Sequence, residues 1–174
     1  MKEVRPLLRL RVFGAMEAWS WTGESILPRG RKAQAILAYL AMCGESTVPR
    51  SRLTKLLWST RWDQQARASL RQSFMELRRG MIAIAPELIC IEKDRVSLKI
   101  AKVWIDGIGI SARAQRSVSQ RDPDTFLESL RGLDAAFDQW IDTKRSTFTQ
   151  SADMEVFATF GEDATTTQVA ARDD

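Results

Sequence analysis

The most regular pattern of apolar and polar residues lies between Trp62 and Met81. At about 100° per residue, one arc of this stretch is mainly apolar and contains Ala66, Leu70, Ser73, Phe74, Leu77 and Met81. A second arc is mainly basic and contains Gln64, Arg67, Arg71, Met75, Arg78 and Arg79, with one acid, Glu76, beside them. The pattern predicts an amphipathic helix of about five turns that buries the first arc and exposes the arginines.

Before this helix, the pattern changes from period two to helical spacing. Alternation between Leu7 and Phe13 predicts a half-buried strand that ends at Gly14, and residues 16–21 and 25–28 are shorter extended segments. We expect these segments to form a small antiparallel sheet. Two tryptophans in the second segment, at positions 19 and 21, would share one face, where packing is a more common role than a binding platform.

Helical spacing then covers residues 31–43, with Gly44 as a typical stop, and residues 48–58, with a proline in the first turn. Residues 59–61 are a short connection to the helix that begins at Trp62. Two helices joined by a short turn, the second of them long and basic, form the arrangement of a helix-turn-helix.

Three cations, Arg29, Arg31 and Lys32, crowd the start of the first helix. This is the unfavourable end for positive charge because of the helix dipole. An anion from outside the chain would explain the cluster, and solvated side chains are the default alternative.

After the long basic helix, the alternating runs 88–91 and 96–100 flank the charged residues 92–95. This order predicts a β-hairpin with a charged tip.

The last part of the chain is less regular. Thr125 and Glu128 have the spacing of a capping box, and helical period continues through Leu133, Phe137, Trp140, Ile141 and Phe148. We therefore expect a helical segment over residues 106–149. From about Gln150 the chain is rich in Ala, Thr, Asp and Glu with little period, which predicts a disordered tail over 150–174.

Charge is distributed unevenly along the chain, although the net charge is only +4. Residues 1–105 contain 19 Lys and Arg against 9 Asp and Glu, whereas residues 106–174 contain 7 against 13. The first part therefore carries +10 and the second −6. A basic part followed by an acidic one favours a polyanion as the partner of the first.

The chemistry of the chain does not favour an enzyme. There is no histidine, which removes the Ser-His-Asp and Cys-His nucleophiles and HExxH zinc sites, and no phosphate-binding glycine loop is present. Asp122 and Asp124 resemble a metal-binding pair but are better explained as the start of a helix. We expect no catalytic residue, no metal site and no cofactor.

Two further expectations concern the surroundings of the protein. Cys43 and Cys90 are flanked by apolar residues without CxxC spacing, which predicts buried thiols in a reducing compartment. No apolar run approaches 18 residues and the first residues lack the apolar region of a signal peptide, so we expect a cytoplasmic protein that does not enter a membrane.

The order of strands, three helices and a hairpin is accompanied by four phrases: residues 10–14 (LRVFG), 30–40 (GRKAQAILAYL), 52–58 (RLTKLLW) and 66–79 (ARASLRQSFMELRR). Together they resemble the Streptomyces antibiotic regulatory protein (SARP) family of transcription activators, whose N-terminal module is similar to the OmpR/PhoB-type winged helix. The resemblance covers about residues 7–106. It implies an α+β fold, with an N-terminal antiparallel sheet, a winged helix-turn-helix, a C-terminal hairpin as the wing, and a helical segment after it.

The resemblance also implies a division of the chain. Residues 1–105 would be the winged-helix DNA-binding domain, and residues 106–149 resemble the start of a bacterial transcriptional activator domain. That second domain ends early, as it would in a truncated piece or in a short relative.

Within this interpretation, the candidate residues divide by chemistry. Four residues on the outer arc of the long helix would read base edges: Ala68, Arg71, Gln72 and Met75. Among them, Arg71 is the best candidate for a bidentate contact with guanine. Those that flank this arc, or lie near the start of the preceding helix, would bind phosphates: Arg50, Arg52, Arg67, Arg78 and Arg79. Lys93 and Arg95 would belong to the wing. By resemblance alone, the candidates for contacting RNA polymerase are Ser59, Thr60, Arg61 and Trp62.

The leading hypothesis is a sequence-specific double-stranded DNA-binding activator that contacts RNA polymerase. The resemblance implies head-to-tail protomers on direct repeats, and without a sustained heptad we expect weak or DNA-dependent dimerisation. The alternative is a protein-interaction module that uses the acidic half and binds no specific DNA. An RNA-binding protein would more naturally interleave aromatic and basic residues on a sheet, a pattern that we do not find in the sequence.

Overall fold

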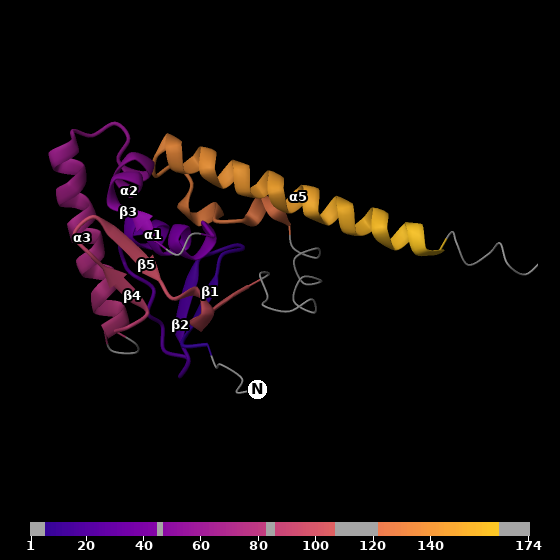
Figure 1. The fold of residues 1–174 in the computed structure, drawn as a ribbon, viewed down its shortest axis with the longest axis horizontal. Helices are drawn as coiled ribbons and strands as arrows, with labels where there is room; N and C mark the ends of the chain where they lie inside the picture. Colours follow the sequence, from indigo (N-terminus) through magenta and orange to yellow (C-terminus); the bar gives the residue numbers. More distant parts are fainter. Residues whose placement is uncertain (1–5, 45–46, 83–85, 107–121, 164–174) are drawn as a thin grey trace, which may run out of the picture.

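The structure is a computed structural model that describes residues 6–44, 47–82, 86–106 and 122–163, with residues 151–163 described as backbone only. It combines helices with two small sheets, so the chain has a mixed α and β fold. Figure 1 shows α3 (Asp63–Ile82) along one side of the molecule, and the long helix α5 (Ala135–Asp163) extending beyond the other side.

The first sheet joins β1 (Leu8–Arg11), β2 (Glu17–Ser20) and β6 (Val103–Ile105) in the order β2-β1-β6. Strand β2 runs antiparallel to β1, whereas β6 runs parallel to it. The predicted antiparallel pairing of the N-terminal segments is therefore confirmed, but the parallel strand β6 was not predicted as part of this sheet. The third expected segment, residues 25–28, contributes only a single bridge between Ser25 and Trp19.

The two tryptophans of this region have different environments. Trp19 is half-buried within β2, but Trp21 lies beyond the end of that strand and is 61% exposed. Packing into the fold was therefore the wrong expectation for Trp21. The strand ends at Ser20 because the chain turns there, with Gly23 at a φ of +87°.

Helix α1 (Arg31–Met42) confirms the predicted helix and supplies the centre of the core. Every residue from Ala35 to Met42 is buried, which the apolar run in this part of the helix explains. Gly44 has a φ of +73°, a left-handed conformation that glycine adopts without steric cost, and it follows the C-cap Cys43 as predicted for a helix stop.

The second sheet has the order β3-β5-β4 and confirms the predicted hairpin. Its hairpin strands are β4 (Ile89–Ile91) and β5 (Arg95–Leu98), and both pairings of the sheet are antiparallel. Strand β3 (Val48–Pro49) was expected to open the second helix, which is wrong. Because the residue before a proline prefers extended backbone, Val48 pairs with Val96, and α2 (Arg50–Leu57) begins one residue after the proline.

Helix α3 follows the sequence pattern closely. Its buried residues are the six of the predicted apolar arc: Ala66, Leu70, Ser73, Phe74, Leu77 and Met81. The arc packs on a core to which α1, α2 and both sheets also contribute. Burial of one arc fixes the rotation of the helix about its own axis, and the arginine side then faces outward.

The chain after residue 121 differs from the expected run of helix. Pro123–Thr125 and Glu128–Leu130 form two short 3-10 turns, η2 and η3, and Asp122 caps the first by accepting a hydrogen bond from the Asp124 N–H. The capping box of Thr125 and Glu128 is therefore not formed. The helix expected to begin there is interrupted at Leu127, whose φ is +49°, and α5 begins only at Ala135.

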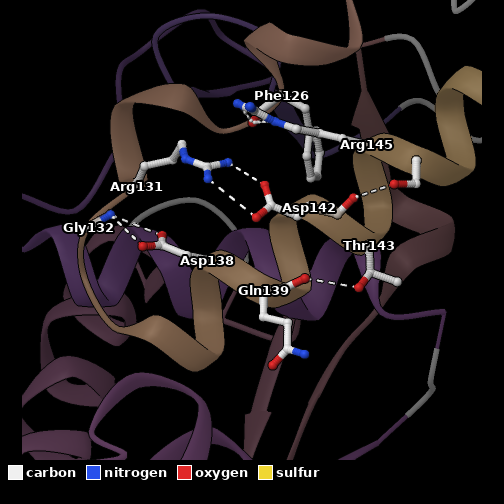
Figure 2. Close-up of polar contacts among 9 residues, drawn as sticks. Phe126, Arg131, Gly132, Asp138, Gln139, Asp142, Thr143 and Arg145 are labelled. Atoms are coloured by element: carbon white, nitrogen blue, oxygen red, sulfur yellow. Dashed lines mark hydrogen bonds and ion pairs between the residues drawn. The ribbon is translucent and has the colours of Figure 1, made fainter.

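Helix α5 continues to Asp163, so the predicted disordered tail does not begin at Gln150. Residues 164–174 of that predicted tail, like residues 107–121 of the expected helical segment, lie outside the described residues. Figure 2 shows how the start of α5 is held by the turn before it. The Arg131 guanidinium pairs with Asp142 at 2.6 Å, and the Gly132 N–H donates to both carboxylate oxygens of Asp138 at 3.0 and 3.1 Å.

Residues 122–148 share the hydrophobic core of the preceding part of the chain. The Leu127 N–H donates to the Val12 carbonyl at 2.8 Å, and Phe13 forms a β-bridge with Phe126. Phe148 completes an aromatic cluster with these two rings, at centroid distances of 5.6 Å to Phe13 and 5.1 Å to Phe126. Residues 122–148 of the acidic half are thus packed into the same core as the basic part.

The two cysteines were expected to have buried thiols, but neither side chain is fully buried. Cys43 is half-buried at the end of α1 and Cys90 is exposed on β4. The expectation of a buried thiol is wrong for Cys90 because alternation along β4 turns Ile89 inward and Cys90 outward.

Candidate nucleic-acid interface

The base-reading candidates lie together on the outer side of α3. All four, Ala68, Arg71, Gln72 and Met75, are exposed. Met75 is 52% exposed although it is apolar, which sets it apart from the buried methionine of the opposite arc, Met81. The exposed side therefore combines hydrogen-bonding groups with small and apolar ones, the mixture that base edges require.

The phosphate candidates of α3 flank this surface. Arg67, Arg78 and Arg79 are exposed, and Arg67 is paired with Asp63 one turn earlier at 2.7 Å. Both partners of that pair are about two-thirds exposed or more, so the pair contributes little to stability and can be exchanged for a phosphate contact.

Glu76, the one acid of the basic arc, has a structural role. Its Oε1 accepts a hydrogen bond from the Gly30 N–H at 2.5 Å, and Gly30 is the residue that precedes α1. A Cβ at position 30 would lie 2.5 Å from Glu76 Oε2, so a larger residue there would require the Glu76 carboxylate to move. This contact joins the outer side of α3 to the start of α1.

A cavity of about 380 Å³ opens between α2, α3 and the tip of the hairpin. Four cations line it together with two acids and three further residues: Arg50, Arg67, Arg71, Lys93, Asp63, Asp94, Ser51, Thr54 and Leu70. The guanidinium of Arg50 lies over the Phe74 ring, 5.1 Å from its centroid, and its buried Nε has no hydrogen-bond partner among the described residues. The remaining phosphate candidate, Arg52, is exposed in the first turn of α2.

The tip of the hairpin is tied to the start of α2. The Arg50 N–H donates to the Asp94 carbonyl at 2.9 Å, which places Lys93 beside the cavity. Lys93 is exposed. Arg95 is also exposed, but it lies 3.3 Å from Glu92 and 3.5 Å from Asp94, so acids partly offset the positive charge of one of the two hairpin candidates.

The candidates for contacting a protein occupy the turn between α2 and α3. Ser59, Thr60, Arg61 and Trp62 are all exposed, and Trp62 reaches 82%. Arg61 donates to the Ser69 hydroxyl at 3.3 Å. An indole exposed to this degree is uncommon, because aromatic side chains usually serve burial.

The same turn is held by the start of α5. The Asp134 carboxylate accepts hydrogen bonds from the Ser59 N–H at 2.9 Å and the Ser59 hydroxyl at 2.7 Å. It also accepts from the Ala136 N–H at 3.0 Å, so it caps α5 as well. Burial raises the pKa of Asp134, but the hydrogen bonds from Ser59 and Ala136 and the nearby Lys32 charge outweigh it, and the pKa is lowered overall.

Two of the three cations at the start of α1 bind carbonyl groups within the chain. Arg31 donates to the carbonyls of Ser129 and Arg131 at 2.8 and 3.1 Å. Lys32 donates to the Leu57 carbonyl at the end of α2 and lies over the Trp58 ring. Burial, followed by the Arg61 charge, lowers the pKa of Lys32. An external anion is therefore not needed to explain this cluster, and Arg29 is exposed.

The sequence analysis missed two arrangements that depend on contacts between distant segments. Asp134 lies two residues after Gly132 and directly before a run of helical period, a pattern that indicates an N-cap. Nothing in the neighbouring sequence indicates that its carboxylate also accepts a hydrogen bond from Ser59. The second arrangement is a row of Trp19, Arg9 and Trp104 across the first sheet. Aromatic and basic residues are thus interleaved on a sheet, a pattern that the sequence analysis did not find.

Comparisons with known proteins do not assign the chain to a family. No protein-family model matches it, and no curated protein matches it. In the part of the chain that the structure describes, no helix is both long enough and apolar enough to cross a membrane. Among the same residues, no three Cys, Asp or Glu side chains are grouped in a way that could hold a metal ion.

Proposed function

We propose that this protein is a sequence-specific double-stranded DNA-binding transcription regulator with a winged helix-turn-helix fold. In this proposal, α2 and α3 form the helix-turn-helix, α3 is the recognition helix and the β4–β5 hairpin is the wing. The protein acts as an activator that contacts RNA polymerase, and it has no enzymatic activity.

The main support is the division of α3 into two sides. Six residues of one arc are buried in the core, while Ala68, Arg71, Gln72 and Met75 are exposed on the other. Arginine and glutamine can each form two hydrogen bonds to one base, and a small or apolar side chain can contact the thymine methyl group. A helix has the width that the major groove admits, so this side of α3 suits base readout.

Phosphate contacts are supported by the positions of the cations around α3. Arg67 and Arg71 share the cavity between α2, α3 and the hairpin with Arg50 and Lys93, and Arg78 and Arg79 lie exposed on the last turns of α3. Phosphates bound on both sides of α3 would fix the register of the helix in the groove.

Activation would use the α2–α3 turn. Trp62 and its neighbours are exposed there, and Asp134 holds Ser59 in place from the opposite side. RNA polymerase is the partner that the resemblance to SARP activators implies for this turn. The same resemblance implies binding to direct repeats, with protomers that associate weakly without DNA.

The alternative function, a protein-interaction module built on the acidic half, needs an exposed apolar surface on that half. Among the described residues 122–150, Phe126, Phe137 and Ile141 are buried in the common core, and no large apolar side chain is exposed. This observation favours the DNA-binding proposal.

The test is a selection of duplexes from a random-sequence pool with the full chain, followed by a salt titration on the selected site. We expect an enriched sequence and, with about five phosphate contacts, a fall of log K against log[salt] with a slope of roughly −5. A folded chain that enriches no sequence and shows no salt-dependent affinity for duplex DNA would refute the proposal.

A further inference from the structure

The outer face of the first sheet carries an aromatic and basic row that the proposed DNA-binding surface does not use. Alternation along β1 turns Leu8 and Leu10 into the core and Arg9 and Arg11 outward. In the sheet register, Arg9 is paired with Trp19 on β2 and with Trp104 on β6. The row Trp19, Arg9, Trp104 therefore crosses all three strands.

A cavity of about 470 Å³ lies over this row. We name this cavity the sheet-face pocket. It is lined by Arg9, Arg11, Trp19, Ser20, Gly23, Trp104 and Asp106. Neighbouring strands are about 4.8 Å apart, so the two tryptophans are attached on either side of Arg9, roughly 10 Å from each other. The volume is in the range of sites for small ligands rather than for a folded partner.

The pocket offers both an aromatic surface and positive charge. The Arg9 guanidinium lies 5.2 Å from the centroid of Trp104, whose side chain remains 39% exposed. Within the described residues, no carboxylate forms an ion pair with Arg9, whereas Arg11 is paired with Glu17 at 3.0 Å on the surface. Asp106 is buried at the edge of the pocket, and one of its oxygens accepts the Val12 N–H.

We propose that the sheet-face pocket binds a mononucleotide. Its base would stack on the indole of Trp104, the exposed tryptophan of the row, and its phosphate would bind Arg9 and Arg11. Stacking on an aromatic side chain is tolerant of base identity, and the planar guanidinium fits phosphate oxygens. The site is built by β1, β2 and β6, so it does not rest on the proposed role of α3.

The register also indicates why one nucleotide is the occupant and not a strand of nucleic acid. On one side, the next outward row pairs Arg11 with Glu17 and presents no aromatic ring for a second base. On the other side, the exposed Trp21 lies beyond the end of β2 and is not among the residues that line the pocket. A stacking platform for a strand needs successive aromatic side chains along its path. An intact duplex is excluded as well, because its bases are already stacked on each other.

The experiment is a calorimetric titration of the full chain with adenosine monophosphate, with adenosine and ribose 5-phosphate as partial ligands. Three variants are compared: Trp104→Leu, Arg9→Gln and, as the matched control, Trp62→Leu on the α2–α3 turn. Both tested side chains are exposed, and circular dichroism of each variant verifies the fold.

We expect saturable binding of adenosine monophosphate below about 1 mM, and weaker binding of each partial ligand. Trp104→Leu should weaken the nucleotide and adenosine by about fivefold or more, the loss of one stacking contact. Arg9→Gln should weaken the nucleotide more than adenosine, and Trp62→Leu should change neither affinity. A duplex that saturates α3 should leave nucleotide binding unchanged.

Four results would overturn the proposal. The first is that adenosine monophosphate shows no saturable binding, and the second is that ribose 5-phosphate binds as tightly as adenosine monophosphate. The third is that a single-stranded oligonucleotide binds more tightly than the mononucleotide, and the fourth is that duplex DNA displaces the nucleotide. Failure of this proposal leaves the DNA-binding proposal intact, because the two surfaces share no residue.

Discussion

Arg79 illustrates what a phosphate contact by one residue should do. It is exposed on the last turn of α3, beside Gln72 and the segment 25–29. Because a phosphate contact carries no sequence information, Arg79→Ala should weaken selected and random duplexes alike and flatten the salt slope by about one unit. Binding measured at several salt concentrations checks this. Arg9→Gln removes the same charge from the sheet face and should leave the slope unchanged.

Asp134 is the residue whose ionisation is most clearly linked to stability. Its pKa is lowered in the folded chain, with burial opposed by the stronger effect of the hydrogen bonds from Ser59 and Ala136. A lowered folded pKa stabilises the fold above the unfolded value, about pH 4, and that stabilisation is lost as the pH falls through the folded value.

The corresponding variant is Asp134→Asn, which keeps one acceptor oxygen but loses the charge and the second acceptor. We expect it to melt at a lower temperature than the wild type at pH 7, by roughly 2–4 °C if the loss resembles that of an N-cap, and we expect the gap to be smaller at pH 3. Asp63→Asn makes the same charge change at an exposed side chain and should have little effect on melting. A gap of the same size at both pH values would contradict the assignment.

Among whole elements, α3 has the strictest division between buried and exposed sides. Leu70 is 2% exposed on the arc opposite Arg71. Leu70→Ala should lower the free energy of unfolding by about 2–5 kcal/mol, through lost burial and the cavity left behind. Denaturant unfolding measures this loss, and Met75→Ala on the exposed arc is the control expected to change little. Equal effects of the two substitutions would mean that the helix is rotated relative to the described arrangement.

The two helices with the most regular spacing, α1 and α3, were predicted well from the sequence. The six buried residues of α3 and the extent of α1 follow from helical period, since a helix forms its backbone hydrogen bonds locally. The short strands could not be predicted in this way. Val103–Ile105 is a strand only because Leu8–Leu10 lies beside it, and Val48–Pro49 only because Arg95 and Val96 do.

The same distinction applies to the candidate site. The exposed arc of α3 could be predicted from the sequence, because helical spacing within one segment defines it. No contact with a distant part of the chain is needed to place these residues on one side of the helix. The Asp134–Ser59 contact and the row of Trp19, Arg9 and Trp104 join residues from distant parts of the chain, so no local pattern predicts them. The interruption at Leu127 also depends on distant packing, because its N–H bonds to Val12.

For the whole molecule, the shared core predicts that residues 1–105 are not stable alone. A chain that ends after Ile105 lacks five side chains that are completely buried: Phe126, Leu127, Leu130, Phe137 and Ile141. Each contributes about 1.5–3 kcal/mol by burial, and the sum is comparable with the entire stability of an ordinary domain.

We therefore expect the 1–105 fragment to lose cooperative thermal unfolding, measured by circular dichroism. A chain that ends after Gln150 keeps the buried side chains and Phe148, and it should melt close to the full chain. A 1–105 fragment that melts at the temperature of the full chain would show that the second segment adds nothing to the core. For this reason, binding experiments belong on the full chain.

The central claim is that the exposed side of α3 reads DNA sequence, and Arg71→Ala tests it most directly. The measurement is the affinity of wild type and variant for the selected duplex and for duplexes that each carry one altered base pair. We predict a loss of about 1–3 kcal/mol on the selected duplex and a relaxed preference at one base pair only, as expected when one bidentate contact is removed. A folded Arg71→Ala chain that keeps the wild-type affinity and the wild-type preference at every position would contradict the claim.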